Sequence, residues 1–355
     1  MFTQLSFPLL LLLFGAAGAA VWVAGIYLSK TTDVLSTRLG LGQALGGLLV
    51  LAVVTNLPEL AITISAALGQ HLELATGNIL GGIAVQTLVL VAFDAFGLGR
   101  QAALTSRVAS LVPVLEGGLV LAVLAAVLLG SQLPASLHVA RVPPGSLLIL
   151  VLWMGGLWLI GKAQHGLPWQ AQHTPLPGSQ PQPKGSSQHA PAAAQQPPPS
   201  TARTALVFLA AAVVTLVAGV VLERSGDALA THWHLSGLLF GATVLAAATS
   251  LPELSTGLAS IKAGDYQLAM SDIFGGNAFL PVLFLLASVL SGQAVLPHAS
   301  RADLYLTGLG MLLTCVYLYG LIFRPRRQVA RMGIDSLVVL GLYALGVLGL
   351  LAISR

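Results

Sequence analysis

Charged residues are scarce in this sequence. Only 8% of the 355 residues are Asp, Glu, Lys or Arg, whereas soluble domains contain about 25%. A further 56% of the residues are hydrophobic. A soluble fold could not keep so apolar a surface in water, but lipid tails accept apolar side chains directly. The composition therefore argues against a soluble protein and indicates a membrane protein.

Cysteines and catalytic motifs are scarce as well. Cys315 is the single cysteine, which excludes an intramolecular disulfide. The Lys and Arg residues are scattered between apolar runs, and this pattern argues against nucleic-acid binding. The sequence contains no His-Glu-x-x-His, no Gly-x-Ser-x-Gly and no phosphate-binding loop. We therefore expect neither an enzyme nor a nucleotide-driven pump, and no cofactor.

Long apolar runs are what the sequence has instead. A spanning helix needs roughly 20 mostly apolar residues, and alternation with period two, typical of strands, is absent. The first run lacks a preceding Lys or Arg, so it is interpreted as a span and not as a secretory signal. We expect an all-α polytopic membrane protein with about ten transmembrane helices, near 6–28, 40–69, 72–97, 108–130, 145–162, 204–223, 235–262, 266–292, 302–323 and 333–353.

The positions of the basic residues predict the orientation of the chain. Cytoplasmic loops of membrane proteins carry an excess of Lys and Arg. With the N-terminus outside, only Arg141, Arg224, Arg301 and Arg355 among the 16 Lys and Arg residues face outwards. Both termini are therefore expected outside, in the plasma (inner) membrane.

A segment rich in Pro, Gln, Ala and Ser separates the two halves of the chain. Residues 163–203 contain few large apolar side chains, which is typical of a disordered linker. The expected orientation places this linker in the cytoplasm. It would divide the chain into a first five-helix repeat, 1–162, and a second, 204–355.

The two halves share a sequence repeat without gaps. A constant offset of 194 positions aligns the Pro-Glu pair at 58–59 with that at 252–253, and the Gly-Gly pair at 81–82 with that at 275–276. Each half has an odd number of spans, so the second copy must enter the membrane from the opposite side. Inverted repeats of this kind are typical of secondary transporters, with the ion site near the middle of the bilayer.

Glu59 and Glu253 are the leading candidates for that site. Glu59 is the only Asp, Glu, Lys or Arg between Arg38 and Glu73, and Glu253 is the only one between Asp227 and Lys262. A charged side chain at the bilayer centre costs about 2.5–3.5 kcal/mol. With no basic residue at comparable depth, each glutamate must be protonated or bound to a cation. The alternative, that both are protonated structural residues, is weakened by their symmetric positions.

Pro58 and Pro252 favour the same interpretation. A proline inside a helix removes one backbone hydrogen bond, so each helix should kink or open just before its glutamate. Freed carbonyl oxygens can then be satisfied by a cation or by water. Further oxygens come from the residues one turn earlier, Thr55, Asn56, Thr249 and Ser250. Carboxylate, carbonyl and hydroxyl oxygens are the ligands that calcium prefers.

The helices that follow carry further polar residues. Asp272 and its counterpart Asn78 are candidates for the ion path, as is Asn277. Inter-helix hydrogen bonding explains Asn78 and Asn277 equally well. Asp94 and Glu116 lie near predicted span ends, which favours interface or structural roles. The Gly-Gly pairs would let these helices approach their neighbours closely.

At these residues the chain resembles the cation/calcium exchanger superfamily. The alpha-repeats of that group look like Thr-Ser-x-Pro-Glu, followed about twenty residues later by Gly-Asn/Asp-x-x-Gly-Ser-Asn. The second half fits with Thr249-Ser250-Leu251-Pro252-Glu253 and Asp272-Ile273-Phe274-Gly275-Gly276-Asn277. The first half fits with changes, as Thr55-Asn56-Leu57-Pro58-Glu59 and Gly77-Asn78-Ile79-Leu80-Gly81-Gly82-Ile83.

The resemblance implies a calcium antiporter. Glu59 and Glu253 would bind calcium and exchange it for sodium or protons by alternating access, with help from Thr55 and Thr249. Asn56, in place of the family's serine, favours proton coupling. The expected partners are calcium, monovalent cations and the lipid bilayer, with no nucleic acid and no obligatory protein. A cation channel, or an antiporter for another cation, remains the alternative.

Overall fold

The computed structural model describes residues 5–38, 53–98, 102–137, 142–164, 200–325 and 327–353. These form α1 (Phe7–Arg38), α3 (Leu57–Gly69), α4 (Leu72–Ala92), the π-helix η3 (Phe93–Gly97), α5 (Leu104–Arg107), α6 (Val112–Ser131), α7 (Pro144–Gln164), α8 (Thr201–His232), α9 (Gly237–Phe240), the π-helix η4 (Gly241–Leu245), α10 (Ala246–Thr249), α11 (Leu251–Lys262), α12 (Tyr266–Phe279), the 3₁₀ turn η5 (Leu280–Val282), α13 (Leu283–Ser291), the 3₁₀ turn η6 (Leu296–His298), α14 (Arg301–Phe323), β1 (Gln328–Val329), β2 (Met332–Gly333) and α15 (Ile334–Ile353). The predicted all-α fold is confirmed; the small β1–β2 hairpin is the exception within these ranges.

Most predicted spans correspond to long apolar helices. Eight helices in the described ranges are long and apolar enough to cross a membrane, and the bent run from Gly237 to Lys262 would be a ninth. The predicted run 40–69 is represented by the shorter helix α3, and its earlier part lies mostly outside the described residues. The predicted linker 163–203 also lies largely outside them, so its disorder and the repeat boundaries stay predictions.

Two helices extend well beyond the runs predicted for them. The run predicted to end at residue 28 continues as helix to Arg38, and the run predicted to end at 223 continues to His232. The hydroxyl groups of Thr31 and Thr32 donate to the Leu28 carbonyl at 3.0 and 2.8 Å, so polar side chains here are satisfied within the helix. Hydropathy marks where the apolar part ends, whereas the helix itself continues.

Both Pro-Glu segments interrupt their helices, as predicted. Residues 53–55 are helical, Asn56 forms a turn, and α3 starts at Leu57. In the second half α10 ends at Thr249, Ser250 follows, and α11 starts at Leu251, with a bend of 40° between the two parts. Each proline lies in the first turn of the new helix, where its missing N–H is not needed.

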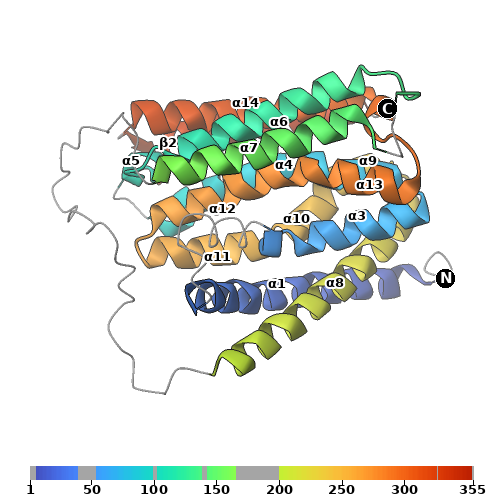
Figure 1. Cartoon of the computed structure of the whole chain (residues 1–355), viewed down its shortest axis with the longest axis horizontal. Coiled ribbons are helices and arrows are strands. Elements are labelled where there is room, and N and C mark those ends of the chain that lie inside the picture. Colours follow the sequence, from blue (N-terminus) through green and yellow to red (C-terminus); the bar gives the residue numbers. More distant parts are fainter. Residues whose placement is uncertain are drawn as a thin grey trace.

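The two interrupted segments run in opposite directions, as the inverted repeat requires. In Figure 1, α3 and α11 both begin near the middle of the bundle and extend to opposite ends. The long helices α1 and α8 cross each other along one side and pack together. α1 begins, and α15 ends, at the same end of the bundle.

Contacts between the halves repeat with the same offset as the sequence. Gly25 of α1 lies against Pro252, and Gly219 of α8 lies against the carbonyl of Pro58. Both glycines and both prolines are 194 positions apart. Residues 23–33 (VAGIYLSKTTD) and 217–227 (VAGVVLERSGD) align at this offset, so the repeat includes α1 and α8. The repeat recognised from the Pro-Glu and Gly-Gly pairs did not include this part.

The centre of the bundle depends on a close helix contact. Gly77 and Gly81 of α4 form a Gly-x-x-x-Gly pair whose missing side chains make room for the backbones of Leu238 and Ala242. Small residues at this spacing allow helices in membranes to approach closely. In the most apolar 18-residue stretch of 72–97, 78% is buried, whereas in that of α15 only 22% is buried. α4 therefore lies at the core and α15 at the periphery.

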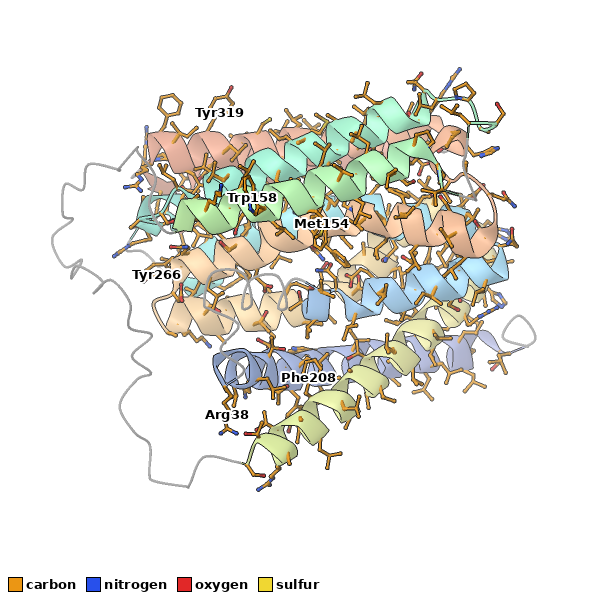
Figure 2. The ribbon with its side chains drawn as sticks, viewed as in Figure 1. Arg38, Met154, Trp158, Phe208, Tyr266 and Tyr319 are labelled. Carbon is orange, nitrogen blue, oxygen red and sulfur yellow. The ribbon has the colours of Figure 1, made fainter. Side chains whose placement is uncertain are left out.

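The outer surface is apolar, as a bilayer requires. Met154, Trp158 and Tyr319 are each more than half exposed, and Figure 2 shows them on the outer helices α7 and α14. Exposed large apolar side chains also line α1, α8 and α15. Contiguous apolar surface on this scale marks contact with lipid.

Candidate ion-binding site

Glu59 and Glu253 are buried where the interrupted helices restart. Their exposed fractions are 0% and 1%, and each lies in the first turn of its helix, α3 or α11. The free N–H groups of a helix N-terminus carry partial positive charge, which stabilises a carboxylate there. The breaks in the two helices therefore place both acidic groups in the interior of the bundle.

The two carboxyl groups lie near each other in the interior of the bundle. The Glu253 carboxylate is close enough to those of Glu59 and Asp272 for direct electrostatic repulsion. None of the four carboxyl oxygens of Glu59 and Glu253 has a hydrogen-bond partner among the described residues. Within the described residues, the ion pairs that join Glu223 or Asp227 to His71 or Arg224 do not include Glu59 or Glu253. A cation or protons must therefore compensate these two acids.

Hydroxyl groups from the second break lie beside the glutamates. Thr249 and Ser250 are buried, and both donate their hydroxyl hydrogens to the Ala246 carbonyl, at 3.2 and 2.8 Å. Their oxygen lone pairs stay available to accept a proton or contact a cation. Thr249 lies next to the Glu59 carboxyl group, so the second half contributes to the surroundings of the first half's acid.

Buried amides surround the first break. Gln86 Nε2 approaches Asn56 Oδ1 at 3.5 Å, and Asn56 Nδ2 approaches Thr55 Oγ1 at 3.5 Å. Gly276 lies directly against Asn56 and Gln86, where a side chain would not fit. The second Gly-Gly pair thus makes room for amides from the other half. Its first-half counterpart, Gly82, lies against Leu280, the residue that corresponds to Gln86.

The structure places the remaining predicted residues at different distances from the acids. Asn277 donates from Nδ2 to Thr87 Oγ1 at 3.1 Å, which gives it a structural contact between halves. Asn78 is fully buried and neither of its side-chain polar atoms has a hydrogen-bond partner in the described ranges. Asp272 is 4% exposed, borders Glu253 and accepts a hydrogen bond from Thr256 Oγ1 at 3.2 Å.

The sequence analysis missed Thr256. Glu116, for which an interface or structural role was expected, is buried, 4% exposed, against α12. The interpretation of Asp94 as structural agrees with its contacts, because it accepts hydrogen bonds from the backbone N–H groups of Leu104 and Gly333. An apolar run reveals that a residue is in the membrane, but not which neighbouring helix it faces.

The arrangement of acids differs from that of a resident metal centre. Within the described ranges, no three His, Cys, Asp or Glu side chains converge as ligands for one metal ion. An ion at the centre would therefore be held by a pair of acids together with neutral oxygens. Neutral oxygens bind less strongly than charged ones, which suits an ion that must also leave.

A second polar cluster connects α3 to α8 away from the centre. Glu223 has no solvent exposure and accepts a hydrogen bond from Ser65 Oγ at 2.7 Å. His71 Nδ1 lies 2.9 Å from Glu223 Oε1, and Arg224 Nε lies 3.2 Å from Oε2. Three partners from two segments therefore converge on one buried carboxylate.

We expect Glu223→Ala to destabilise the protein by about 1.5–3 kcal/mol for each charge-assisted hydrogen bond that is lost. Asp227→Ala is the control, because Asp227 is partly exposed and its contact with His71 is longer, at 3.8 Å. Exposed pairs contribute about 0–1 kcal/mol. Thermal unfolding in detergent micelles measures both variants, and equal shifts in the two would contradict the proposed anchoring role of Glu223.

Comparisons with known proteins agree with this arrangement. The family model described as sodium/calcium exchanger protein matches residues 9–161 and 203–352. The inner membrane protein YrbG of Escherichia coli (strain K12) is 27% identical over 273 residues, which cover 76% of this chain and 77% of that protein.

Two solved structures have the same fold. The H⁺/Ca²⁺ exchanger CAX gives a TM-score of 0.65 at 15% identity, over 96% of this chain and 82% of that one. The sodium-calcium exchanger NCX_Mj gives 0.60 at 14% identity, over 96% of this chain and 98% of that one. Because the family model matches both halves of the chain, this protein belongs to the sodium/calcium exchanger family.

Proposed function

We propose that this protein is a secondary active cation antiporter that exchanges calcium for protons or sodium by alternating access. The observation that carries the proposal is the pair of buried glutamates at equivalent positions of two inverted repeats, whose carboxyl oxygens have no hydrogen-bond partner among the described residues. Each lies where a helix is interrupted, so neutral oxygens are available beside it. An ion bound at such a position can become accessible from either side when one repeat moves against the other.

Calcium fits the chemistry of these side chains. It takes 6–8 oxygen ligands at about 2.3–2.6 Å, and two carboxylates neutralise its charge. Glu59 and Glu253 would supply the charged ligands. The neutral oxygens would come from Thr55, Asn56, Thr249 and Ser250, with Asp272, Asn78 and Asn277 nearby along the ion path. Calcium is the transported substrate in this proposal, and no cofactor is invoked.

Protons are the counter-ion that the residues favour. Asn56 and Gln86 approach each other beside the first break, where they present amides in place of hydroxyl groups. Gly82 and Gly276 stand where the related motif has serine. Fewer hydroxyl oxygens are therefore available to coordinate sodium, whereas protons require only the carboxylates themselves.

The remaining properties follow from this activity. We infer a transporter and not an enzyme, with both termini outside the plasma (inner) membrane, as the distribution of Lys and Arg predicts. Its partners would be calcium, monovalent cations and lipid, without nucleic acid or an obligatory protein. Moving one net charge across the membrane is worth about 2.3 kcal/mol per 100 mV, so the exchange ratio would decide the direction of transport.

Calcium uptake into liposomes tests the proposal. We expect the purified full-length protein to accumulate radioactive calcium when an outward proton gradient is imposed, and less when the gradient is of sodium. Protein-free liposomes and a proton ionophore are the controls. If folded protein accumulated no calcium under either gradient, calcium exchange would be wrong. Uptake that depended on the calcium gradient alone would indicate a channel.

A further inference from the structure

The connection between α14 and α15 carries a concentration of positive charge that the proposed transport does not use. Four of the 16 Lys and Arg residues lie within positions 324–331, and no Asp or Glu occurs between Asp303 and Asp335. The positive-inside rule explains basic residues in a loop, but it does not require that loop to fold. Here the loop folds as the antiparallel β1–β2 hairpin.

The hairpin is attached to the body of the protein at both of its ends. Just before it, Arg324 Nη2 donates a hydrogen bond to the Val108 carbonyl at 2.8 Å. At the end of β2, the backbone N–H of Gly333 donates to the Asp94 carboxylate. Figure 1 shows β2 beside α5, at the end of the bundle where α14 stops. The arginines are therefore carried by a fixed part of the fold.

The turn that joins the two strands has an unusual backbone. Ala330 and Arg331 have φ angles of 52° and 70°, a left-handed conformation that Asn and Gly usually adopt in two-residue hairpin turns. Other residues adopt it at a cost in free energy, and such costs gather at functional positions. Val329, just before the turn, is 48% exposed. The tip of the hairpin thus combines a charged side chain with an exposed apolar one.

Aromatic side chains mark the level of the membrane surface just before the hairpin. Tyr319 and Phe323 are 63% and 76% exposed, and their rings stack one turn apart at the end of α14. Figure 2 shows Tyr319 on the outer side of the bundle. At the end of α7, Lys162 lies over the ring of the exposed Trp158. Such aromatic residues concentrate where acyl chains meet headgroups, so the hairpin begins at the depth of the lipid phosphates.

The arginines of the hairpin have no anionic partner within the described part of the protein. Arg327 and Arg331 are exposed, and neither side chain forms an ion pair or a hydrogen bond within these ranges. Asp94 and Asp335, the acids that contact the hairpin at Gly333, are buried and accept hydrogen bonds from α5. The charge of the two arginines is therefore available to a ligand from outside the protein.

We propose that the β1–β2 hairpin and its arginines form a docking surface for the headgroups of anionic phospholipids. The planar guanidinium groups of Arg327 and Arg331 would pair with phosphate oxygens, which match their fork of N–H donors. Val329 and Phe323 would contact the upper part of the acyl chains. Each basic residue near an anionic membrane surface strengthens binding by about fivefold, the equivalent of about 1 kcal/mol.

This docking surface is expected on one side of the membrane only. At the repeat offset of 194 positions, the connection 324–331 corresponds to 130–137, whose sequence GSQLPASL contains no basic residue. The lipid contact is therefore a feature of the second half alone. Because Gly333 donates to Asp94 of η3, which continues α4, a bound headgroup would also stabilise this end of the central helix.

Native mass spectrometry of the purified full-length protein in detergent micelles counts the lipids that bind to it. The probes are dimyristoyl phosphatidylglycerol, which is anionic, and dimyristoyl phosphatidylcholine, which has the same chains but no net charge. We expect the wild type to bind phosphatidylglycerol about tenfold or more tightly than phosphatidylcholine. Arg327→Gln and Arg331→Gln should each weaken the binding of phosphatidylglycerol about fivefold. Arg301→Gln is the matched control, because Arg301 is exposed at the other end of α14, and it should bind as the wild type does.

Equal affinities for the two lipids, or equal losses in Arg331→Gln and Arg301→Gln, would overturn the docking surface. Displacement of phosphatidylglycerol by inorganic phosphate would indicate a site for free anions and refute the lipid. If the hairpin variants did not fold, the wild type alone would decide. Salt screens exposed charges, so binding of phosphatidylglycerol that high salt left unchanged would contradict the proposed contact. Lipid binding does not depend on the proposed antiport, and a failure of calcium uptake would leave it standing.

Discussion

We expect Glu253→Gln, and equally Glu59→Gln, to abolish gradient-driven calcium uptake while leaving the protein folded. Glutamine has the size of glutamate but no charge, so it preserves packing. One carboxylate alone leaves a divalent ion half neutralised inside the membrane. Uncompensated charge there costs about 2.5–3.5 kcal/mol, and each 1.4 kcal/mol is about tenfold in affinity. Calcium affinity should therefore fall by about 100-fold or more.

The control for this prediction is Glu73→Gln. Glu73 begins the helix that follows α3, but its side chain is exposed at the end of the bundle. At this position, the same loss of charge should leave calcium uptake close to that of the wild type. Uptake is measured in liposomes at matched protein density, and folding by the elution profile from size-exclusion chromatography. A central variant that transported calcium at the wild-type rate would refute the role assigned to its glutamate.

The central acids could be predicted because they stand out in the sequence. Glu59 and Glu253 are lone charges in apolar runs, each follows a proline, and both occur at one offset. Each of these signals can be recognised from neighbouring residues or from the constant offset between the two halves. The same holds for the breaks at Asn56 and Ser250, which follow from the backbone chemistry of proline. The repeat in α1 and α8 was equally readable, because residues 23–33 match 217–227 at the offset already known.

Contacts between distant helices could not be predicted in this way. Ser65 and Glu223 are 158 residues apart, yet they share a hydrogen bond of 2.7 Å. An interface or structural role was expected for Glu116 because it lies near the end of an apolar run. Its contact with Ser271 and Asp272 exists only because α6 packs on α12. Helix packing in membranes depends on shape and small residues, and a single sequence shows these weakly.

The Gly-x-x-x-Gly pair of α4 gives a second prediction with a large effect. The Gly-Gly pairs were expected to allow close approach, and Gly81 does lie against the backbone of Ala242 in η4. The contact is reciprocal, because a Cβ on Gly241 would meet the Leu74 carbonyl oxygen at 2.6 Å. Backbone atoms cannot move aside as the end of a flexible side chain can. Even one added methyl group must therefore force the two segments apart.

We accordingly expect Gly81→Ala to destabilise the protein by about 3 kcal/mol or more, at or above the upper end of the usual cost of overpacking. Gly118→Ala is the control, because Gly118 lies in α6 and a Cβ there meets nothing within 4 Å. Alanine is favoured over glycine inside a helix by about 1 kcal/mol, so this control should be neutral or stabilising. Thermal unfolding in the same detergent measures both variants.

If Gly81→Ala lowers the stability of the protein and Gly118→Ala does not, the loss of stability comes from the α4–η4 contact and not from replacing glycine in general.

The contact between α4 and η4 matters for transport because η4 leads through α10 into the break at Ser250, and α4 carries Asn78 and Gln86. Separating the two segments moves the second break away from the amides of the first half. We therefore expect Gly81→Ala to lower calcium affinity as well as stability, and Gly81→Ala with wild-type stability and affinity would refute this coupling.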